Sequence, residues 1–431
     1  MNQNRDGTKI PIYRHQMVIF TSLFISYVFY YLMRKSFSLI LPELLITSII
    51  DQNDAGIILS AQSISYTISK FIGGILSDRI SAKILFINGL FLSSLTTVLF
   101  AFGPQTMTSF TILWFLNGLA QGLGWPSLVK ILQQWTSSKQ FGTYYSVLSA
   151  SANVSGGLSP LLATLMTRSF GWQNTLISFG VVSVFISMIS SLMISNCPED
   201  IGLAAINQET VKMQESSIKW KELMKSPFIW LLSISYLVVF AAKTTACDWG
   251  QLYLIDERQK SQLIASTFTS SVESGGFFGA ILAGYLSDRL IVAKKTKSSN
   301  CCDRLPVATA MMALSTFALH SLCFHVDSST SHLFIAILGF ILGLAFYGPI
   351  IIFGMVATEA VPTNLSGTSH AIVALAANIG AIISGLPFTM FAQLYSWKMV
   401  FFLLELSTAS IVLLLAITGH RLRPDFAKKN D

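Results

Sequence analysis

The sequence predicts an all-α membrane protein of twelve transmembrane helices, arranged as two pseudo-symmetric six-helix halves. Composition is the first observation: of 431 residues, 52% are hydrophobic and 11% are charged, and the mean hydropathy is +0.61. Soluble domains carry about 25% charged residues. The second observation is a series of apolar stretches of about 20 residues or more, the length that crosses a bilayer. The third is a motif repeated in both halves.

The same composition disfavours other classes of protein. The apolar content excludes a disordered chain. The net charge of +7 is dispersed, so the sequence offers no nucleic-acid-binding patch. Five cysteines form no disulfide framework, and adjacent Cys301 and Cys302 lack the spacing and His ligands of a zinc site. We find no catalytic, Walker, metal or cofactor motif, so we expect neither an enzyme nor a bound cofactor.

Each predicted helix is an apolar stretch bounded by polar residues. The first follows a polar N-terminus and is too long for a signal peptide, so we expect it to be retained. The predicted helices span 16–41, 55–76, 82–102, 106–131, 141–167, 172–195, 227–254, 263–289, 305–325, 332–358, 366–394 and 397–419.

The longest polar interruption, 196–226, lies near the middle of the chain. We interpret it as a cytosolic linker between an N-terminal half (1–195) and a C-terminal half (227–419), with a tail at 420–431. Most Lys and Arg residues outside the helices fall on the side that holds both termini. The other side has only Arg168, Arg258, Lys260 and Lys398. Because positive loops stay cytosolic, we expect both termini in the cytosol.

The two halves repeat one another. The stretch from Gly74 to Arg79 recurs from Gly284 to Arg289, a shift of 210. Three later landmarks recur with a shift of 225: Gly142-Thr143, Asn153 and Trp172 recur as Gly367-Thr368, Asn378 and Trp397. The difference fits an insertion in the basic loop around 291–304. Such duplication is typical of transporters whose halves are related by an axis along the membrane normal.

Charged residues inside predicted helices are the main candidates for a binding site, because charge in a bilayer is costly. Arg34 and Lys243 are near-equivalent in the repeat, so we expect both to reach a central cavity. Two cations there predict a doubly charged anion such as a phosphate monoester. Lys35 can line the cavity edge or snorkel, Lys70 and Asp248 are candidates for gating, and Glu273 and Glu405 are more often structural.

Polar and aromatic residues at helical spacing accompany these charges. Such side chains suit a polyhydroxyl ligand, although each can instead make an ordinary interhelical hydrogen bond. His370 can alternatively carry a proton. The candidates for the sugar or the cavity wall are Tyr30, Gln62, Tyr66, Gln121, Trp125, Asn153, His370 and Asn378.

Three stretches together resemble the organophosphate:phosphate antiporters of the major facilitator superfamily. They are Tyr30 to Lys35, Ser69 to Arg79, and Lys243 followed by Asp248-Trp249. Runs at 114–126, 236–240, 248–251 and 367–378 are most similar to the animal endoplasmic-reticulum branch of that family. The resemblance implies exchange of glucose 6-phosphate for inorganic phosphate across the reticulum membrane, in support of a luminal glucose-6-phosphatase. It also implies that Arg34 and Lys243 bind phosphate.

The chain departs from bacterial members at two places. The bacterial glycerol-3-phosphate antiporter has arginine where this chain has Lys243. Bacterial members also have a His in helix 5, where this chain reads Ser151-Ala152-Asn153. A substrate role for a helix 5 His is therefore not carried over.

The repeated loop motifs and the tail complete the predicted functional residues. We expect the motif glycines to let helices approach closely, and Asp78, Arg79, Asp288 and Arg289 to act in gating or at an interface between the halves. The alternative is a solvated turn. Lys428 and Lys429 resemble a cytosolic dilysine retrieval signal. Asn364-Leu-Ser366 falls in a predicted cytosolic loop, so we expect it to be unmodified.

Three other functions stay open at this stage. Two are transport functions: a broader exchanger that takes glycerol 3-phosphate, and a phosphate/proton symporter that uses His370 and Asp248. The third is a membrane sensor that binds sugar phosphate and signals through the linker at 196–226.

Overall fold

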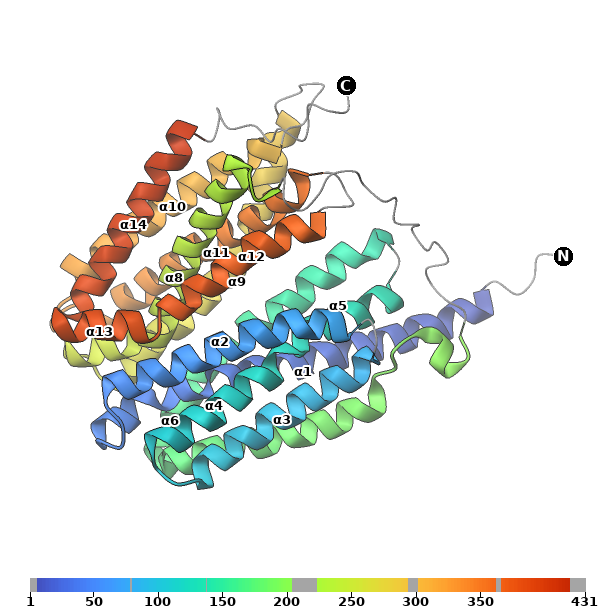
Figure 1. Ribbon diagram of the computed structural model, residues 1–431, viewed down its shortest axis with the longest axis horizontal. Helices are drawn as coiled ribbons and strands as arrows, with labels where there is room; N and C mark the ends of the chain where they lie inside the picture. The colour runs from blue at the N-terminus through green and yellow to red at the C-terminus, as the bar shows by residue number, and fades with distance from the viewer. Residues whose placement is uncertain are drawn as a thin grey trace. The chain divides into compact units, whose positions relative to one another are not determined.

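The computed structural model describes residues 6–77, 80–136, 138–203, 223–293, 301–361 and 366–418. Every regular element in these ranges is helical (Figure 1), as the sequence predicts. The chain divides into two compact units, residues 1–211 and 212–431. The division falls inside the segment that we interpret as a linker, of which residues 204–222 lie outside the described ranges.

The first unit contains six α-helical segments. They are α1 (Asp6–Ile46), α2 (Gln52–Leu76), α3 (Ala82–Phe102), α4 (Met107–Gly122), α5 (Gly124–Trp135) and α6 (Ser138–Met193), followed by a 3₁₀ turn at Pro198–Ile201. The long α6 joins two helices across Gly171, whose φ of 80° and ψ of 164° are non-helical. Only glycine adopts this conformation readily, so the break falls between the predicted helices 141–167 and 172–195.

The second unit has the same order of helices. It comprises α8 (Pro227–Asp256), α9 (Gln262–Ala293), a 3₁₀ turn at Cys301–Arg304, α10 (Leu305–Phe324), α11 (His332–Glu359), α12 (Ser366–Ile383), α13 (Leu386–Leu394) and α14 (Trp397–Thr418). The axes of α12 and α13 meet at 40°. The predicted helix 366–394 is therefore bent, next to Pro387.

Fewer than twelve helices pass a strict test of length and apolarity. Seven helices among the described residues pass, or eight if α12 and α13 form one broken span. One reason is that the apolar run Val147–Met193 of α6 counts once although it contains two predicted helices. A second is that α2 carries Gln52, Asp54, Gln62 and Lys70. Polar residues in a membrane helix are functional candidates, so the polar residues that keep α2 from passing the test are of interest.

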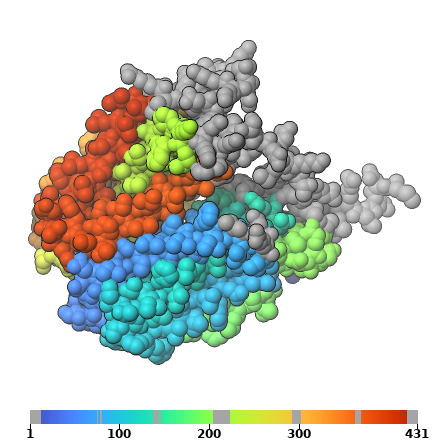
Figure 2. All heavy atoms as spheres, in the orientation of Figure 1, coloured from blue at the N-terminus to red at the C-terminus, as the bar shows by residue number. Residues whose placement is uncertain are grey.

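The same pairs of helices, by their position in the repeat, pack together in both units. In the first unit α1 lies against α6 and α2 lies against α4, while in the second α8 lies against α12 and α9 lies against α11 (Figure 1). Figure 2 shows side chains filling the space between α2, α3 and α4. Dense packing of this kind fixes the polar side chains that these helices carry.

Two glycines mark close helix crossings at equivalent places in the two units. A Cβ added to Gly118 of α4 would overlap the backbone of Gln62 in α2, and one added to Gly343 of α11 would overlap the carbonyl of Val272 in α9. Gln62 and Val272 differ by 210 in number, and Gly118 and Gly343 differ by 225. The structure therefore supports the duplication that the sequence motifs indicate.

The motif glycines behave differently from our expectation. A Cβ added to Gly74 or to Gly284 would meet nothing within 4 Å in its surroundings. Neither glycine therefore marks a close crossing with another helix of its own unit. Asp78 and Arg79 of the first motif lie outside the described residues.

Candidate functional site

Arg34 is the centre of a polar cluster inside the first unit. Its guanidinium lies over the ring of Tyr66, 4.1 Å from the centroid, and 5.9 Å from the centroid of Tyr31. Its Nε atom is buried and has no hydrogen-bond partner among the described residues. A buried N–H without a partner is costly. This nitrogen is therefore available to a ligand.

The backbone at Arg34 is held by α2. The amide of Gln62 donates to the carbonyl oxygen of Arg34 at 3.1 Å and to Oδ1 of Asn117 at 3.4 Å. Asn117 in turn donates to the carbonyl of Ser93 at 3.0 Å and to Thr96 at 3.2 Å. Gln62 thus joins α1, α2 and α4. Among the predicted cavity residues, it holds the backbone at Arg34.

Tyr66 lies between two cations. The ammonium of Lys70 is 5.6 Å from the ring centroid that Arg34 also faces. A ring face attracts a cation without neutralising its charge. Arg34, Tyr66 and Lys70 therefore form one half-buried cluster of positive charge; Lys35, the neighbour of Arg34, is also half-buried.

Gln121 of α4 has a buried side-chain amide without hydrogen-bond partners in the described part of the chain. Its side chain is 1% exposed, and neither its amide nitrogen nor its oxygen has a hydrogen-bond partner among the described residues. Asn117, one turn earlier on α4, contacts Gln62 of α2 and Ser93 of α3. Residues four apart lie on the same face of a helix. Gln121 therefore lies on the face of α4 that is packed against α2 and α3.

The aromatic candidates of this unit divide into two kinds. Tyr30 is fully buried in the hydrophobic core, and its hydroxyl donates to the carbonyl of Phe86 at 2.6 Å. Its only O–H is used, so Tyr30 has a packing role here. Trp125 is half-buried and contacts Tyr27 and Tyr145, with ring centroids 5.0 and 5.3 Å apart. Asn153 is buried.

In the second unit, Lys243 is already paired. Its ammonium lies 3.5 Å from Oε1 of Glu273, whose side chain is 2% exposed. The hydroxyl of Tyr347 donates a very short hydrogen bond to Oε2 of the same carboxylate, and the Tyr347 ring centroid lies 5.1 Å from the Lys243 ammonium. Cys247 donates to Oε1 at 3.4 Å. Of the two cations that the sequence predicts for the site, Lys243 therefore has a counter-ion within its own unit.

Glu273 and Tyr347 are the residues that sequence reasoning undervalued or missed. A carboxylate deep in an apolar helix requires a cation. This rule points from Glu273 to Lys243, which is the basic residue away from the helix ends in the predicted helices of that half. Tyr347 gave no signal, because a single tyrosine in an apolar helix is ordinary.

The other candidates of the second unit occupy separate places. Nδ1 of His370 lies 3.4 Å from the carbonyl of Gly354, and Asn378 is half-buried on the same helix. Asp248 is buried on α8, five residues beyond Lys243. Glu405 is paired with His320, 2.9 Å away on α10, which agrees with the structural role that its position favours.

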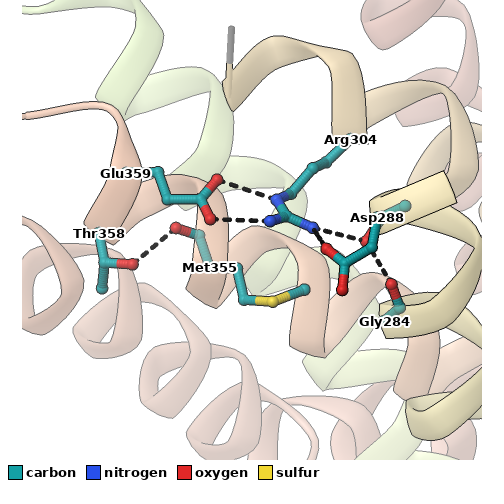
Figure 3. A network of polar contacts seen from close by, with 7 residues as sticks. Gly284, Asp288, Arg304, Met355, Thr358 and Glu359 are labelled. Atoms are coloured by element: carbon teal, nitrogen blue, oxygen red, sulfur yellow. Dashed lines mark hydrogen bonds and ion pairs between the residues drawn. The ribbon is translucent and has the colours of Figure 1, made fainter. Parts of the chain in front are cut away.

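The second loop motif belongs to a clasp at the ends of α9 and α11 (Figure 3). Arg304 makes two 2.9 Å hydrogen bonds to Glu359 and one of 2.5 Å to Asp288. Burial would lower the pKa of Arg304, but its bonds to Glu359 and Asp288 raise it above the ordinary value. Asp288 therefore pairs inside its own unit. Arg289 lies over the ring of Tyr285, 5.1 Å away.

Two further sequence predictions concern metal binding and the C-terminal tail. The described ranges contain no group of three or more His, Cys, Asp or Glu side chains that could hold a metal ion. The tail residues Lys428 and Lys429 lie outside those ranges.

Comparison with known proteins gives a consistent picture. Residues 23–385 match the family model described as Major Facilitator Superfamily. The chain is 29% identical to the membrane sensor protein UhpC of Salmonella typhimurium, covering 92% of this chain and 90% of that protein. It is 30% identical to a probable hexose phosphate transport protein of Chlamydia muridarum (92% and 89%). It is 27% identical to a glycerol-3-phosphate transporter of Bacillus subtilis (94% and 93%).

Solved structures share the fold at low identity. A bacterial homolog of the human lysosomal transporter Spinster, in an inward-facing unoccupied conformation, gives a TM-score of 0.71 at 14% identity, covering 94% of this chain and 96% of that one. A mutant of the nucleoside transporter NupG gives 0.69 at 12% identity, covering 93% and 99%. At this identity the likeness concerns the fold alone.

Proposed function

Since the chain belongs to the Major Facilitator Superfamily, a family of multi-pass membrane transporters, we propose that it exchanges glucose 6-phosphate for inorganic phosphate. Exchange proceeds by alternating access across the endoplasmic-reticulum membrane. The names of the relatives support a phosphorylated substrate, because they include hexose phosphate and glycerol-3-phosphate transporters. The preference for glucose 6-phosphate and the reticulum location rest on the sequence runs at 114–126 and 367–378 and on the dilysine tail.

The buried, unpartnered Nε of Arg34 carries this proposal. A guanidinium presents its N–H groups in a planar fork that matches two oxygens of a phosphate. The Tyr66 ring covers one face of the guanidinium, and the buried Nε N–H is left for the ligand. A doubly charged phosphate group would satisfy both the buried N–H and the charge of the cluster.

Lys243 supplies the second contact to the phosphate group. Its position in the repeat is near-equivalent to that of Arg34. Because Glu273 neutralises Lys243 in the absence of ligand, a phosphate group that binds Lys243 competes with this carboxylate. Binding then has a cost that only a strongly anionic ligand offsets. This competition favours phosphate compounds over neutral sugars.

The sugar end of the substrate is recognised by amides and by one indole. In this proposal the unpartnered amide of Gln121 bonds sugar hydroxyls, and Trp125 offers a ring face. Asn153, His370 and Asn378 complete the set. Gln62 and Tyr66 hold Arg34, Lys35 lines the cavity edge, and Lys70, Asp78, Arg79, Asp248, Asp288 and Arg289 take part in gating.

Topology and location complete the proposal. Both termini lie in the cytosol, where a receptor reads Lys428 and Lys429 as a retrieval signal. Glucose 6-phosphate that enters the lumen would supply a luminal glucose-6-phosphatase.

Uptake by proteoliposomes tests the exchange. We expect radiolabelled glucose 6-phosphate to enter vesicles that are preloaded with phosphate and to stay outside vesicles that are not. Uptake without internal phosphate would contradict exchange, and dependence on a pH gradient would favour the symporter with His370 and Asp248. Exchange of glycerol 3-phosphate without glucose 6-phosphate would keep the phosphate contacts and overturn the hexose assignment.

The likeness to UhpC favours one alternative of a different class. That relative is described as a membrane sensor protein, so a non-transporting sensor of sugar phosphate is the second candidate. A sensor would bind glucose 6-phosphate without moving it. Saturable binding by purified protein, together with no exchange of any phosphate compound in the same vesicles, would support the sensor.

A further inference from the structure

The repeat permits a residue-by-residue comparison of the two helix crossings that flank the cations. Gly118 lies against Gln62 in the first unit, and Gly343 lies against Val272 in the second. These pairs fix the offsets at 210 for α2 and α9 and at 225 for α4 and α11. One turn further along each helix, Tyr66 of α2 corresponds to Gly276 of α9, and Gly122 of α4 corresponds to Tyr347 of α11.

Tyrosine and glycine have therefore changed places between the helices of the crossing. In the first unit α2 carries the tyrosine and α4 carries the glycine. In the second unit α9 carries the glycine and α11 carries the tyrosine. In the second unit a Cβ added to Gly276 would meet the ring of Tyr347, so these two positions compete for one space. In the first unit a Cβ added to Gly122 would meet Ser69 and the backbone of Lys70.

The ring reaches the cation in both cases. Tyr66 lies 4.1 Å from the guanidinium carbon of Arg34, and Tyr347 lies 5.1 Å from the ammonium of Lys243. Filling the space at the crossing requires only a large side chain, and a leucine would be large enough. Two units that place a tyrosine ring beside a cation from different helices indicate a requirement for the ring.

We propose that an aromatic ring beside the cation is a required part of each half of the substrate site, supplied by whichever helix of the crossing pair carries the tyrosine. Tyr347 is thus a positioning residue for Lys243, equivalent to Tyr66 for Arg34. The ring stabilises the buried cation through its face, and at Arg34 the Nε donor stays open to a phosphate group. This inference rests on the proposed exchange of sugar phosphate for phosphate.

The exchange of positions allows a rescue experiment. Tyr347→Gly should raise the KM for glucose 6-phosphate exchange about tenfold, as expected for the loss of a buried cation–π contact. Adding Gly276→Tyr to that variant returns the ring from α9, the arrangement found in the first unit. We expect the KM of this double variant to come within about threefold of the wild type. Gly276→Tyr alone should be inactive, because its side chain overlaps the ring of Tyr347.

A matched double variant separates the ring from its bulk. Tyr347→Gly with Gly276→Leu fills the same space with an apolar side chain that has no aromatic face. We expect it to fold, as judged by size-exclusion chromatography in detergent, and to keep the high KM of Tyr347→Gly. Tyr347→Phe, which retains the ring, should keep the KM within about threefold of the wild type.

Three outcomes would overturn the inference. They are a normal KM for Tyr347→Gly, equal rescue by leucine and tyrosine at position 276, and no rescue by a well-folded tyrosine double variant. Each is read against the wild type in the same vesicles. Absence of exchange in the wild type would instead overturn the proposed function, so the two failures are distinguishable.

Discussion

At the scale of single residues, the shape of the Arg34 side chain matters as much as its charge. Arg34→Lys keeps the charge but removes the planar fork and the buried Nε donor. We expect phosphate exchange to fall by about tenfold or more, the value of one or two charge-assisted hydrogen bonds. Arg14→Lys, an exposed change on the same helix, is the control and should leave exchange unchanged. Normal exchange by Arg34→Lys would remove Arg34 from the phosphate site.

The pairing of Lys243 with Glu273 changes what removal of the lysine should do. Lys243→Ala leaves a 2% exposed carboxylate without its cation, which costs about 3–5 kcal/mol. We therefore expect this variant to have a lower melting temperature than the wild type. Adding Glu273→Gln should restore stability but not transport.

Thermal unfolding in detergent and vesicle exchange read the two effects separately. If the double variant melts no higher than Lys243→Ala, the carboxylate is not the source of the instability. If it transports normally, Lys243 is not a ligand for the substrate.

The roles of some side chains in the candidate site can be predicted from the sequence, and those of others cannot. Arg34, Lys70 and Tyr66 were predictable, because charge and periodicity within an apolar helix identify a polar face. The exclusive role of Tyr30 in packing was not predictable, because it depends on the carbonyl of Phe86, 56 residues away. Contacts between distant helices depend on rotation about each helix axis, and residue spacing fixes that rotation only approximately.

At the scale of helices, a glycine in the sequence shows a helix crossing only when the helix packed against it is known. Gly343→Ala should destabilise the second unit by about 1–3 kcal/mol, because the new methyl group overlaps the backbone of Val272. Gly284→Ala, in the loop motif, meets nothing within 4 Å and should be tolerated in stability. Melting temperatures of the two variants test this difference, and equal losses would contradict it.

The clasp at Arg304 joins the ends of two helices. The side chain of Arg304 is 11% exposed, whereas those of Glu359 and Asp288 are 39% and 68% exposed. Solvent screens the exposed partners, so Asp288→Asn should cost less than about 1 kcal/mol. Arg304→Leu removes bonds to both partners and should cost about 1–3 kcal/mol. The clasp is contradicted if unfolding temperatures show the reverse order.

Helix positions were largely predictable, and helix continuity was not. Apolar runs located the helices, but α4 and α5 are separate on either side of Leu123, where one helix was predicted. Pro126 and Pro387 follow the two breaks within a few residues and are the visible signals. An apolar stretch indicates that a segment is buried in protein or in lipid, but it gives no information about where the helix bends.

At the scale of the whole molecule, duplication preserves the helix crossing and permits the side chains to differ. Gly118 and Gly343 perform the same task in their units, yet the cation is arginine in one and lysine in the other. Among the described residues Arg34 contacts no carboxylate, whereas Lys243 is paired with Glu273. In the proposed function both cations bind the phosphate group, and only Lys243 has to exchange a carboxylate for it.

The final prediction concerns orientation, which the distribution of Lys and Arg determines. It places the tail in the cytosol and the loop at 325–331 in the lumen. In sealed microsomes, protease should remove an epitope appended after Asp431. A cysteine introduced by Ser328→Cys, at an exposed position in that loop, should react with a membrane-impermeant maleimide only after detergent opens the vesicles. The wild type measures labelling of the native cysteines. Extra labelling of Ser328→Cys in intact vesicles, with a protected epitope, would reverse the orientation and remove the basis for a cytosolic retrieval signal.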